Sequence, residues 1–328
     1  MMPSIRIGGP VPSTTTKGNS RAAASKAPSK YSYEALNHEI EEFVLEATTL
    51  RPMETRARET MIENVVAVGR SLWGPAVTIC TFGSYATGLS LPTSDVDVCL
   101  CIPSDAGEVD VKSLWDFAKK MKDDVGKETS VFADAKTPIV RVFETPNPVD
   151  GCRFHCDVSL SHTVAGLEEL VASQTSYLES TPVARPLIVT TKAILKMWGL
   201  NTVRTGGLSS ASVFLFVQRF LEEERVNLKP TVDNLGRLLV ELWFHSCSSE
   251  FDEGFCLWDP FDPMNDVSAG TFRIPDIQQL LGHTANFLHT LIHHGSPPAA
   301  PSCATTSSMR RAMLSTVLMD PRQPLPFY

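Results

Sequence analysis

Apolar and polar positions alternate along the chain in patterns that divide it into a strand-rich part and a helix-rich part. Short apolar or alternating runs predict strands at about 76–82, 95–102, 138–144 and 153–160. A polar helical pattern near residues 111–124 separates the second strand from the third. This order predicts an α/β unit built around a small mixed sheet.

Apolar residues at helical spacing lie on both sides of this unit. Before it, residues 33–50 and 61–72 show the three- and four-residue spacing of helices with one buried face. After Arg185 the pattern is helical almost throughout, with helices expected at about 186–198, 209–223, 234–246 and 274–292. The later part of the chain should therefore be mainly α-helical.

These patterns predict a two-lobed architecture, in which a small mixed β-sheet with helices precedes a mainly helical domain. The expected segments are a basic tail (1–33), an N-terminal helix packing on the helical domain (34–60), the α/β domain (61–184), the helical domain (185–294) and a linker with a C-terminal tail (295–328). The first segment is rich in small and polar residues, which predicts disorder. Its basic, acid-free composition is also compatible with a mitochondrial or plastid transit peptide.

The net charge of −8 limits the partners that we expect. Because the first 33 residues carry five basic side chains and no acidic one, the rest of the chain carries −13 and gains little general attraction to nucleic acid. Any RNA binding should therefore be local, weak or assisted by another protein. No apolar run approaches the length of a membrane span, so we expect no membrane association.

The cysteine pattern indicates an intracellular, reducing compartment. None of the eight cysteines forms a CxxC pair, so a zinc site or a disulfide framework is not expected. The nucleus or the cytoplasm is the expected location, and the mitochondrion is the alternative if the tail is a transit peptide.

The most informative segment joins Gly83-Ser84, which follows an apolar run, to Asp95-Val96-Asp97 ten residues later. Residues i and i+2 of a strand point to the same face, so the two aspartates should project side by side. Two carboxylates this close repel each other unless a cation lies between them, and oxygen ligands favour Mg²⁺. A Gly-Ser turn can offer N–H groups and a hydroxyl to phosphate oxygens. Together these features indicate phosphoryl or nucleotidyl transfer.

This string resembles the signature of the DNA polymerase β-like nucleotidyltransferase superfamily, which has a third carboxylate on a later strand. Asp157 is the candidate here, because it lies in the strand pattern at 153–160. Aspartate is disfavoured inside strands, so it needs a reason to be there, and a third metal ligand supplies one.

Further along, Lys192 and Lys196 share one face of a predicted helix, and Ser209-Ser210 follows a Gly-Gly turn. Asp259-Pro260-Phe261 and Asn265-Asp266-Val267 come next. In this order the motifs resemble the central and PAP-associated domains of the noncanonical poly(A) polymerases and terminal uridylyltransferases. The resemblance covers residues 34–292.

The resemblance implies a role for each matching residue. Asp95 and Asp97 would ligate two Mg²⁺ or Mn²⁺ ions, and Asp157 would ligate the ion that activates the RNA 3′-hydroxyl. Ser84 would hold the β- and γ-phosphates of the nucleotide, and Gly83 would also belong to the nucleotide-binding residues. Further nucleotide contacts would come from the helix lysines, the serine turn and the base-selecting loop, that is, from Lys192, Lys196, Ser209, Ser210 and Asn265.

The resulting expectation is an RNA 3′-terminal adenylyltransferase that uses ATP without a template and acts by a two-metal displacement. Relatives that add uridylyl groups often carry a histidine where an ungapped alignment places Asn265, so asparagine favours ATP. A terminal uridylyltransferase using UTP is the close alternative, and a catalytically silent nucleotide-binding scaffold is the third. An RNA-binding protein subunit is an expected partner, as some relatives require.

The chain departs from the family pattern in three places. Asp266 stands where relatives usually have asparagine, and Ala211 stands where relatives have an aromatic residue that stacks on the base. Near Val164 the chain lacks the asparagine that contacts the ribose in relatives. These departures predict weaker nucleotide binding or poorer base and sugar discrimination.

Overall fold

The computed structural model describes residues 31–144, 154–224, 230–247, 256–262 and 264–295, together with Leu314 and Leu318. The predicted N-terminal tail and the C-terminal linker lie almost wholly outside these residues. Buried apolar side chains in the described part form two clusters, one around the sheet and one among the later helices. No helix in the described ranges is both long and apolar enough to cross a bilayer.

A five-stranded mixed sheet forms the first half of the fold. Its spatial order is β1-β2-β5-β4-β3, and β2–β5 is its parallel pair while the other neighbours are antiparallel. The strands are β1 (Thr78–Phe82), β2 (Val96–Cys101), β3 (Thr129–Phe132), β4 (Ile139–Phe143) and β5 (His155–Ser161). The predicted fold class, a small mixed sheet followed by helices, is confirmed.

Two helices pack on the sheet and complete its core. α2 (Pro52–Trp73) and α4 (Val111–Val125) contact each other, and both contribute apolar side chains to the cluster that the strands form. Met61 and Val65 of α2 are fully buried in this cluster, as is Phe117 of α4. α2 begins earlier than its apolar spacing predicted, so the expected division at residue 61 falls inside it.

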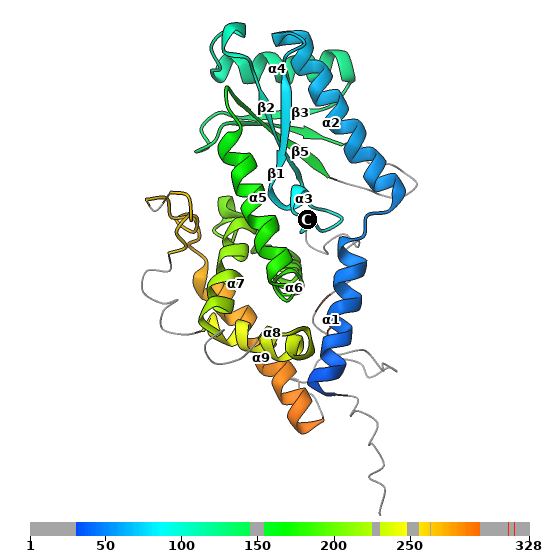
Figure 1. Cartoon of the computed structure of the whole chain (residues 1–328), viewed down its shortest axis with the longest axis vertical. Helices are drawn as coiled ribbons and strands as arrows, with labels where there is room; N and C mark the ends of the chain where they lie inside the picture. The colour runs from blue at the N-terminus through cyan, green and yellow to red at the C-terminus, as the bar shows by residue number, and fades with distance from the viewer. Residues whose placement is uncertain are drawn as a thin grey trace, which may run out of the picture.

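The second cluster joins the first helix of the chain to the later ones. α1 (Tyr33–Thr48) packs on α6 (Ala184–Met197) and α8 (Leu235–His245). The Asn37 side chain donates to the Asp233 carbonyl and accepts from the Gly236 N–H. Figure 1 shows this helical part at one end of the molecule and the sheet with α2 and α4 at the other. The later helices are α5 (Ala165–Ser180), α6 (Ala184–Met197), α7 (Ser210–Glu224), α8 (Leu235–His245) and α9 (Ile274–His294).

The strand β3 and the helix α5 were not predicted from the sequence. β3 has only four residues and pairs with β4 as the outer strand, so its apolar pattern is too short to stand out. α5 buries only Leu178, so it lacks the apolar stripe on which a helix prediction depends. It nevertheless contacts β1 and lies between the sheet and α7, close to the residues described next (Figure 1).

Candidate functional site

The carboxylates come together because β2 and β5 are neighbouring parallel strands. Asp97 of β2 is the register partner of Asp157 of β5, so both side chains leave the same face of the sheet. Asp95 directly precedes β2 and lies two residues before Asp97, while His155 lies two residues before Asp157. Asp95 and His155 are therefore also neighbours. The register thus places three aspartates and one histidine in a compact group on one face.

The turn at Gly83 and Ser84 is built against this group. β1 ends at Phe82, which faces Asp97 in the antiparallel register, and the chain then enters the short helix α3 (Gly83–Ala86). Gly83 has a φ of 66°, and a Cβ at this position would overlap the Asp97 carboxylate. Glycine is therefore needed both for the backbone conformation and for space. The Ser84 hydroxyl lies 3.3 Å from the Ser90 hydroxyl.

Burial and mutual repulsion set the charge states of the carboxylates. Burial, followed by the charges of Asp95 and Asp157, raises the pKa of Asp97 to about 7. Burial also acts to raise the pKa of Asp95, but the adjacent His155 and two nearby cations outweigh it and hold that pKa below its usual value. Asp97 is therefore the carboxyl group that would gain most from a bound cation.

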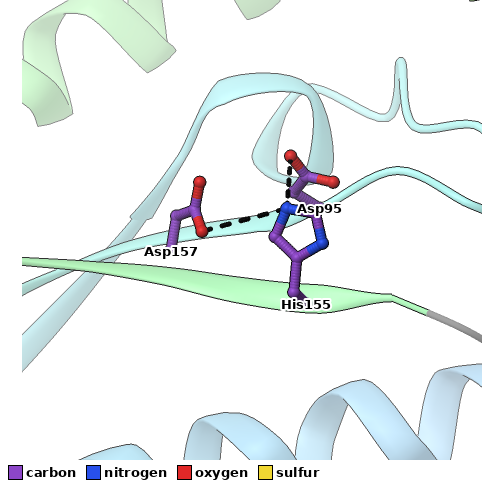
Figure 2. Close-up of side chains that lie close together, drawn as sticks. All are labelled: Asp95, His155 and Asp157. Carbon is purple, nitrogen blue, oxygen red and sulfur yellow. Dashed lines mark ion pairs between the residues drawn. The ribbon is translucent and has the colours of Figure 1, made fainter. Parts of the chain in front are cut away.

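Two basic side chains in this group were not predicted from the sequence. Arg141 of β4 is the register partner of Asp157 and donates to its two oxygens, from Nε at 2.8 Å and from Nη2 at 2.7 Å. Figure 2 shows the His155 ring beside the carboxylates of Asp95 and Asp157, with Nε2 3.0 Å from Asp95 Oδ2 and 3.9 Å from Asp157 Oδ1. Strand alternation was the available signal for His155, which lies two residues before Asp157 on the same face of β5. Arg141 has only apolar neighbours on its face of β4, so its place in the group depends on the pairing of β4 with β5.

A cleft of about 460 Å³ opens next to these residues, between the sheet and the helical part. Eight of the ten residues singled out in the sequence line it: Gly83, Ser84, Asp95, Asp97, Lys192, Lys196, Ser209 and Ser210. Asp157 lies beside Asp97, one strand further from the cleft. Asn265 is not among the described residues that line it.

The two lysines of α6 point their ammonium groups at the backbone between the Gly-Ser turn and Asp95. Lys192 Nζ donates to the Leu89 carbonyl at 2.8 Å, and Lys196 Nζ donates to the Thr93 carbonyl at 2.6 Å. Burial lowers the pKa of Lys192 to about 7 and that of Lys196 to about 8. Each lysine is thus a desolvated cation whose charge would be stabilised by an anion in the cleft.

The serine turn connects the cleft to the loop that contains Asn265. Ser209 Oγ accepts from the Ser212 N–H at 3.0 Å, and the Ser212 hydroxyl donates to the Val267 carbonyl at 3.1 Å. Ala211 is exposed and lines the cleft without offering a ring, while Phe214 one turn later also lines it. Phe214 is therefore the nearest aromatic on this face of α7.

Asn265 lies in the loop before α9 and outside the cleft. Its amide donates to Asp259 Oδ2 at 3.1 Å, and its carbonyl oxygen accepts from Lys136 of the β3–β4 turn. Asp266 fixes the same loop by accepting from the Leu257 N–H at 3.0 Å, which gives its substitution for the family's asparagine a structural role.

A second, smaller cavity of about 100 Å³ lies between this loop and the cleft. Asp259-Pro260-Phe261 and Val267 line it, together with Ala211 and Phe214, which also line the cleft. The loop therefore lies next to Ala211 and Phe214, which form part of the cleft wall, whereas Asn265 lines neither cavity.

The residues of the site fit a divalent metal centre. Asp95, His155 and Asp157 each offer one ligand atom, and these atoms lie within 4.8 Å of one another. Carboxylate oxygens are the ligands that Mg²⁺ prefers, and a cation would relieve the repulsion that raises the pKa of Asp97.

Comparison with known proteins gives a consistent family assignment. Residues 36–168 match the family described as "Poly(A) RNA polymerase, mitochondrial-like, central palm domain". Poly(A) RNA polymerase protein 2 of Saccharomyces cerevisiae is 29% identical over 277 residues, which cover 74% of this chain and 46% of that protein. The chain thus spans about half the length of this curated relative and less than half the length of two other curated relatives that it matches.

Solved structures of two RNA-processing polymerases share the fold of this chain. The polymerase core of TRAMP, an RNA surveillance complex, matches with a TM-score of 0.67 and 23% identity, over 87% of this chain and 94% of that chain. The Cid1 poly(U) polymerase bound to MgGTP matches with a TM-score of 0.65 and 16% identity, over 87% of this chain and 99% of that chain.

Proposed function

Because the chain belongs to the noncanonical poly(A) polymerase and terminal uridylyltransferase family, we propose that it adds AMP from ATP to RNA 3′ ends without a template. The observation that carries this proposal is the register of β2 and β5, which sets Asp157 beside Asp97 at the edge of the cleft. In this proposal residues 61–184 form the catalytic domain and residues 185–294 hold the nucleotide from the opposite side.

Asp95, Asp97 and Asp157 would hold two divalent ions, Mg²⁺ or Mn²⁺. When bound, such ions lower the pKa of an attacking hydroxyl and neutralise charge on a leaving pyrophosphate. The chain itself contributes the positions of these three carboxylates, which the sheet register sets before any substrate arrives. No covalent nucleophile is required.

The remaining residues would bind and orient the triphosphate. Gly83 and Ser84 offer an N–H group and a hydroxyl at the start of α3, directly beside the carboxylates. Lys192 and Lys196 would exchange a backbone carbonyl for phosphate oxygens, which better compensate a buried ammonium group. Ser209 and Ser210 line the facing wall of the same cleft.

ATP is the proposed nucleotide because several curated relatives of the chain are named poly(A) RNA polymerases. Asn265 would act through the position of its loop, since its amide contacts Asp259 and Lys136 and the loop reaches the cleft through the smaller cavity. The residue at position 265 would then alter base choice by changing how this loop packs.

RNA affinity would come in part from a second protein. The chain outside the first 33 residues carries a net charge of −13, which disfavours binding of a polyanion by general attraction. The TRAMP neighbour is the polymerase core of a complex, which supports the proposal that an RNA-binding subunit assists this chain.

Extension of a labelled RNA oligonucleotide with ATP, UTP, CTP or GTP singly tests the proposal. A ladder of products with ATP alone is the expected result. A ladder with UTP alone would instead assign the uridylyltransferase alternative. Absence of any ladder, even with a basic RNA-binding subunit added, would contradict polymerase activity and favour the silent scaffold.

A further inference from the structure

The face of the sheet that carries the carboxylates continues beyond them onto β4 and β3. Asp97 of β2 is the register partner of Asp157 of β5, which in turn is the register partner of Arg141 of β4. Phe132, the last residue of β3, pairs with Ile139, which lies two residues before Arg141 on the same face. Across the sheet this face therefore presents, in order, Asp97, Asp157, Arg141 and Phe132.

The proposed reaction assigns one substrate to each side of this row. In an in-line displacement, the attacking hydroxyl and the leaving pyrophosphate lie on opposite sides of the phosphorus atom. The turn at Gly83 and Ser84, which would hold the triphosphate, follows β1 and so lies on the β1 side of Asp97. The RNA 3′ end would therefore approach from the other side, over β5, β4 and β3.

We propose that Arg204 and Lys136 bind the phosphates of the RNA strand next to its 3′ end, and that Phe132 positions Arg204 for this contact. We call these three residues the acceptor surface. The inference rests on the proposed function, because it assigns a site to the acceptor strand of that reaction. The occupant that it names is single-stranded RNA, held by its backbone and therefore without regard to base sequence.

Arg204 is an exposed cation without an acidic partner in the described part of the chain. Its guanidinium carbon lies 5.5 Å from the centroid of the Phe132 ring, and that of Arg141 lies 5.3 Å from the same centroid. Arg141 is neutralised by Asp157, whose two oxygens accept its hydrogen bonds. Arg204 forms no hydrogen bond or ion pair with a described residue, so its N–H donors are available to a phosphate.

Lys136 adds a second cation at the same edge of the sheet. It is exposed in the turn at residues 133–138, which joins β3 to β4. Its ammonium group donates to the side-chain oxygen of Asn265, a neutral acceptor, and forms no ion pair within the described ranges. Asp134, the acidic residue of the same turn, is exposed and does not pair with it. The positive charge of Lys136 is therefore also available to a phosphate.

The acceptor surface exists only where the two parts of the fold meet. Phe132 belongs to the sheet, whereas Arg204 belongs to the 3₁₀ turn Val203–Thr205 of the helical part. Residues 201–203, directly before Arg204, line the cleft, so a phosphate bound to Arg204 would lie at its rim. These cations supply local attraction to RNA in a chain whose residues after the first 33 carry a net charge of −13.

RNA binding by the full chain, without nucleotide, tests the acceptor surface directly. Fluorescence anisotropy of a labelled oligoadenylate would be followed over a range of salt concentrations for Arg204→Gln, Lys136→Gln and the double variant. Arg56→Gln and Lys119→Gln are the matched controls. Each removes one exposed charge, from α2 and α4 respectively, and these helices pack on the opposite face of the sheet.

Each single variant should weaken RNA binding by roughly fivefold or more, through the loss of a charge-assisted phosphate contact. The slope of log affinity against log salt concentration should become shallower by about 0.7 for each lost contact, and both controls should match the wild type. Unchanged RNA affinity and salt slope in the double variant would overturn the proposal. A wild type that binds no RNA even at low salt would overturn it as well.

Phe132→Leu tests the positioning role of the ring, because its effect should depend on Arg204. Leucine keeps an apolar side chain but removes the cation–π contact. The substitution should weaken RNA binding in the wild type and add nothing in Arg204→Gln. Equal weakening in both backgrounds would give Phe132 a structural role only and remove it from the acceptor surface.

Extension kinetics separate this inference from the proposed function. In Arg204→Gln and Lys136→Gln the KM for RNA should rise while the KM for ATP stays unchanged, because neither side chain would contact the triphosphate. RNA extension with wild-type KM values in both variants would leave the proposed function standing and remove the acceptor surface. Loss of RNA affinity in these variants, in a protein that extends no RNA with any nucleotide, would do the reverse.

Discussion

Replacing Asp97 with asparagine should stabilise the metal-free fold while it removes a metal ligand. The Asp97 side chain is largely buried beside Asp95 and Asp157, and this environment raises its pKa to about 7. Asparagine has nearly the same shape and carries no charge. The variant therefore keeps the packing against Gly83 and loses only the repulsion.

The size of the effect follows from the difference between the pKa of the carboxyl group in the folded chain and its ordinary value of 3.8. One pKa unit corresponds to about 1.4 kcal/mol, so the ionised form lowers the free energy of unfolding by at most about 4 kcal/mol above pH 7. Because the folded pKa is the higher one, the stabilising contribution of protonated Asp97 is complete below pH 3.8 and is lost as the pH rises to about 7. The asparagine side chain cannot ionise, so the advantage of the variant should fall by about half between pH 8 and pH 5.5.

Urea unfolding in EDTA at these two pH values measures the difference, and repeating it with millimolar Mg²⁺ measures metal binding. Mg²⁺ should stabilise the wild type and leave the variant unchanged. Asp105→Asn, which alters an exposed aspartate, is the matched control and should behave as the wild type. An asparagine variant that is less stable than the wild type at pH 8 in EDTA would refute the reasoning, and so would equal stabilisation of both by Mg²⁺.

Three further substitutions test other parts of the site. Asn265→His should lower the ratio of ATP to UTP incorporation by roughly tenfold, as measured in competition on one RNA, and an unchanged ratio would exclude a role of this loop in base choice. Gly83→Ala should destabilise the fold by at least about 1–2 kcal/mol in urea unfolding, because of its positive φ and the overlap with Asp97. A Gly83→Ala protein of wild-type stability and activity would contradict that packing. Lys192→Met should weaken ATP binding roughly 10- to 100-fold in calorimetry through loss of a charge-assisted contact, whereas the exposed control Lys112→Met should have no effect. Equal ATP affinity in both variants would place Lys192 outside the triphosphate site.

Local pattern was sufficient to predict the elements that carry the aspartates. β1, β2 and β5 have short apolar runs on their buried faces, and an acidic residue that interrupts such a run draws attention on chemical grounds alone. α6 and α7 have clear apolar stripes, so the lysine pair and the serine turn could be placed on helices. The relation of these elements to a nucleotide came from the family resemblance.

Long-range pairing was not accessible from the pattern. Arg141 becomes a partner of Asp157 only because β4 lies next to β5, and His155 meets Asp95 only because β5 pairs in parallel with a strand about sixty residues earlier. Lys192 also could not be predicted to bind the Leu89 carbonyl, since that contact depends on how α6 packs against the segment after the Gly-Ser turn. Sequence reasoning thus identifies residues with suitable chemistry more readily than their partners.

AMP incorporation and pyrophosphate release, measured together on one RNA with Mg²⁺ and ATP, test the central claim most directly. The account predicts one pyrophosphate for each AMP added by the wild type and a loss of roughly a hundredfold or more in Asp97→Asn, whose folding the urea experiment verifies. RNA extension by Asp97→Asn at the wild-type rate, or extension without pyrophosphate release, would contradict it.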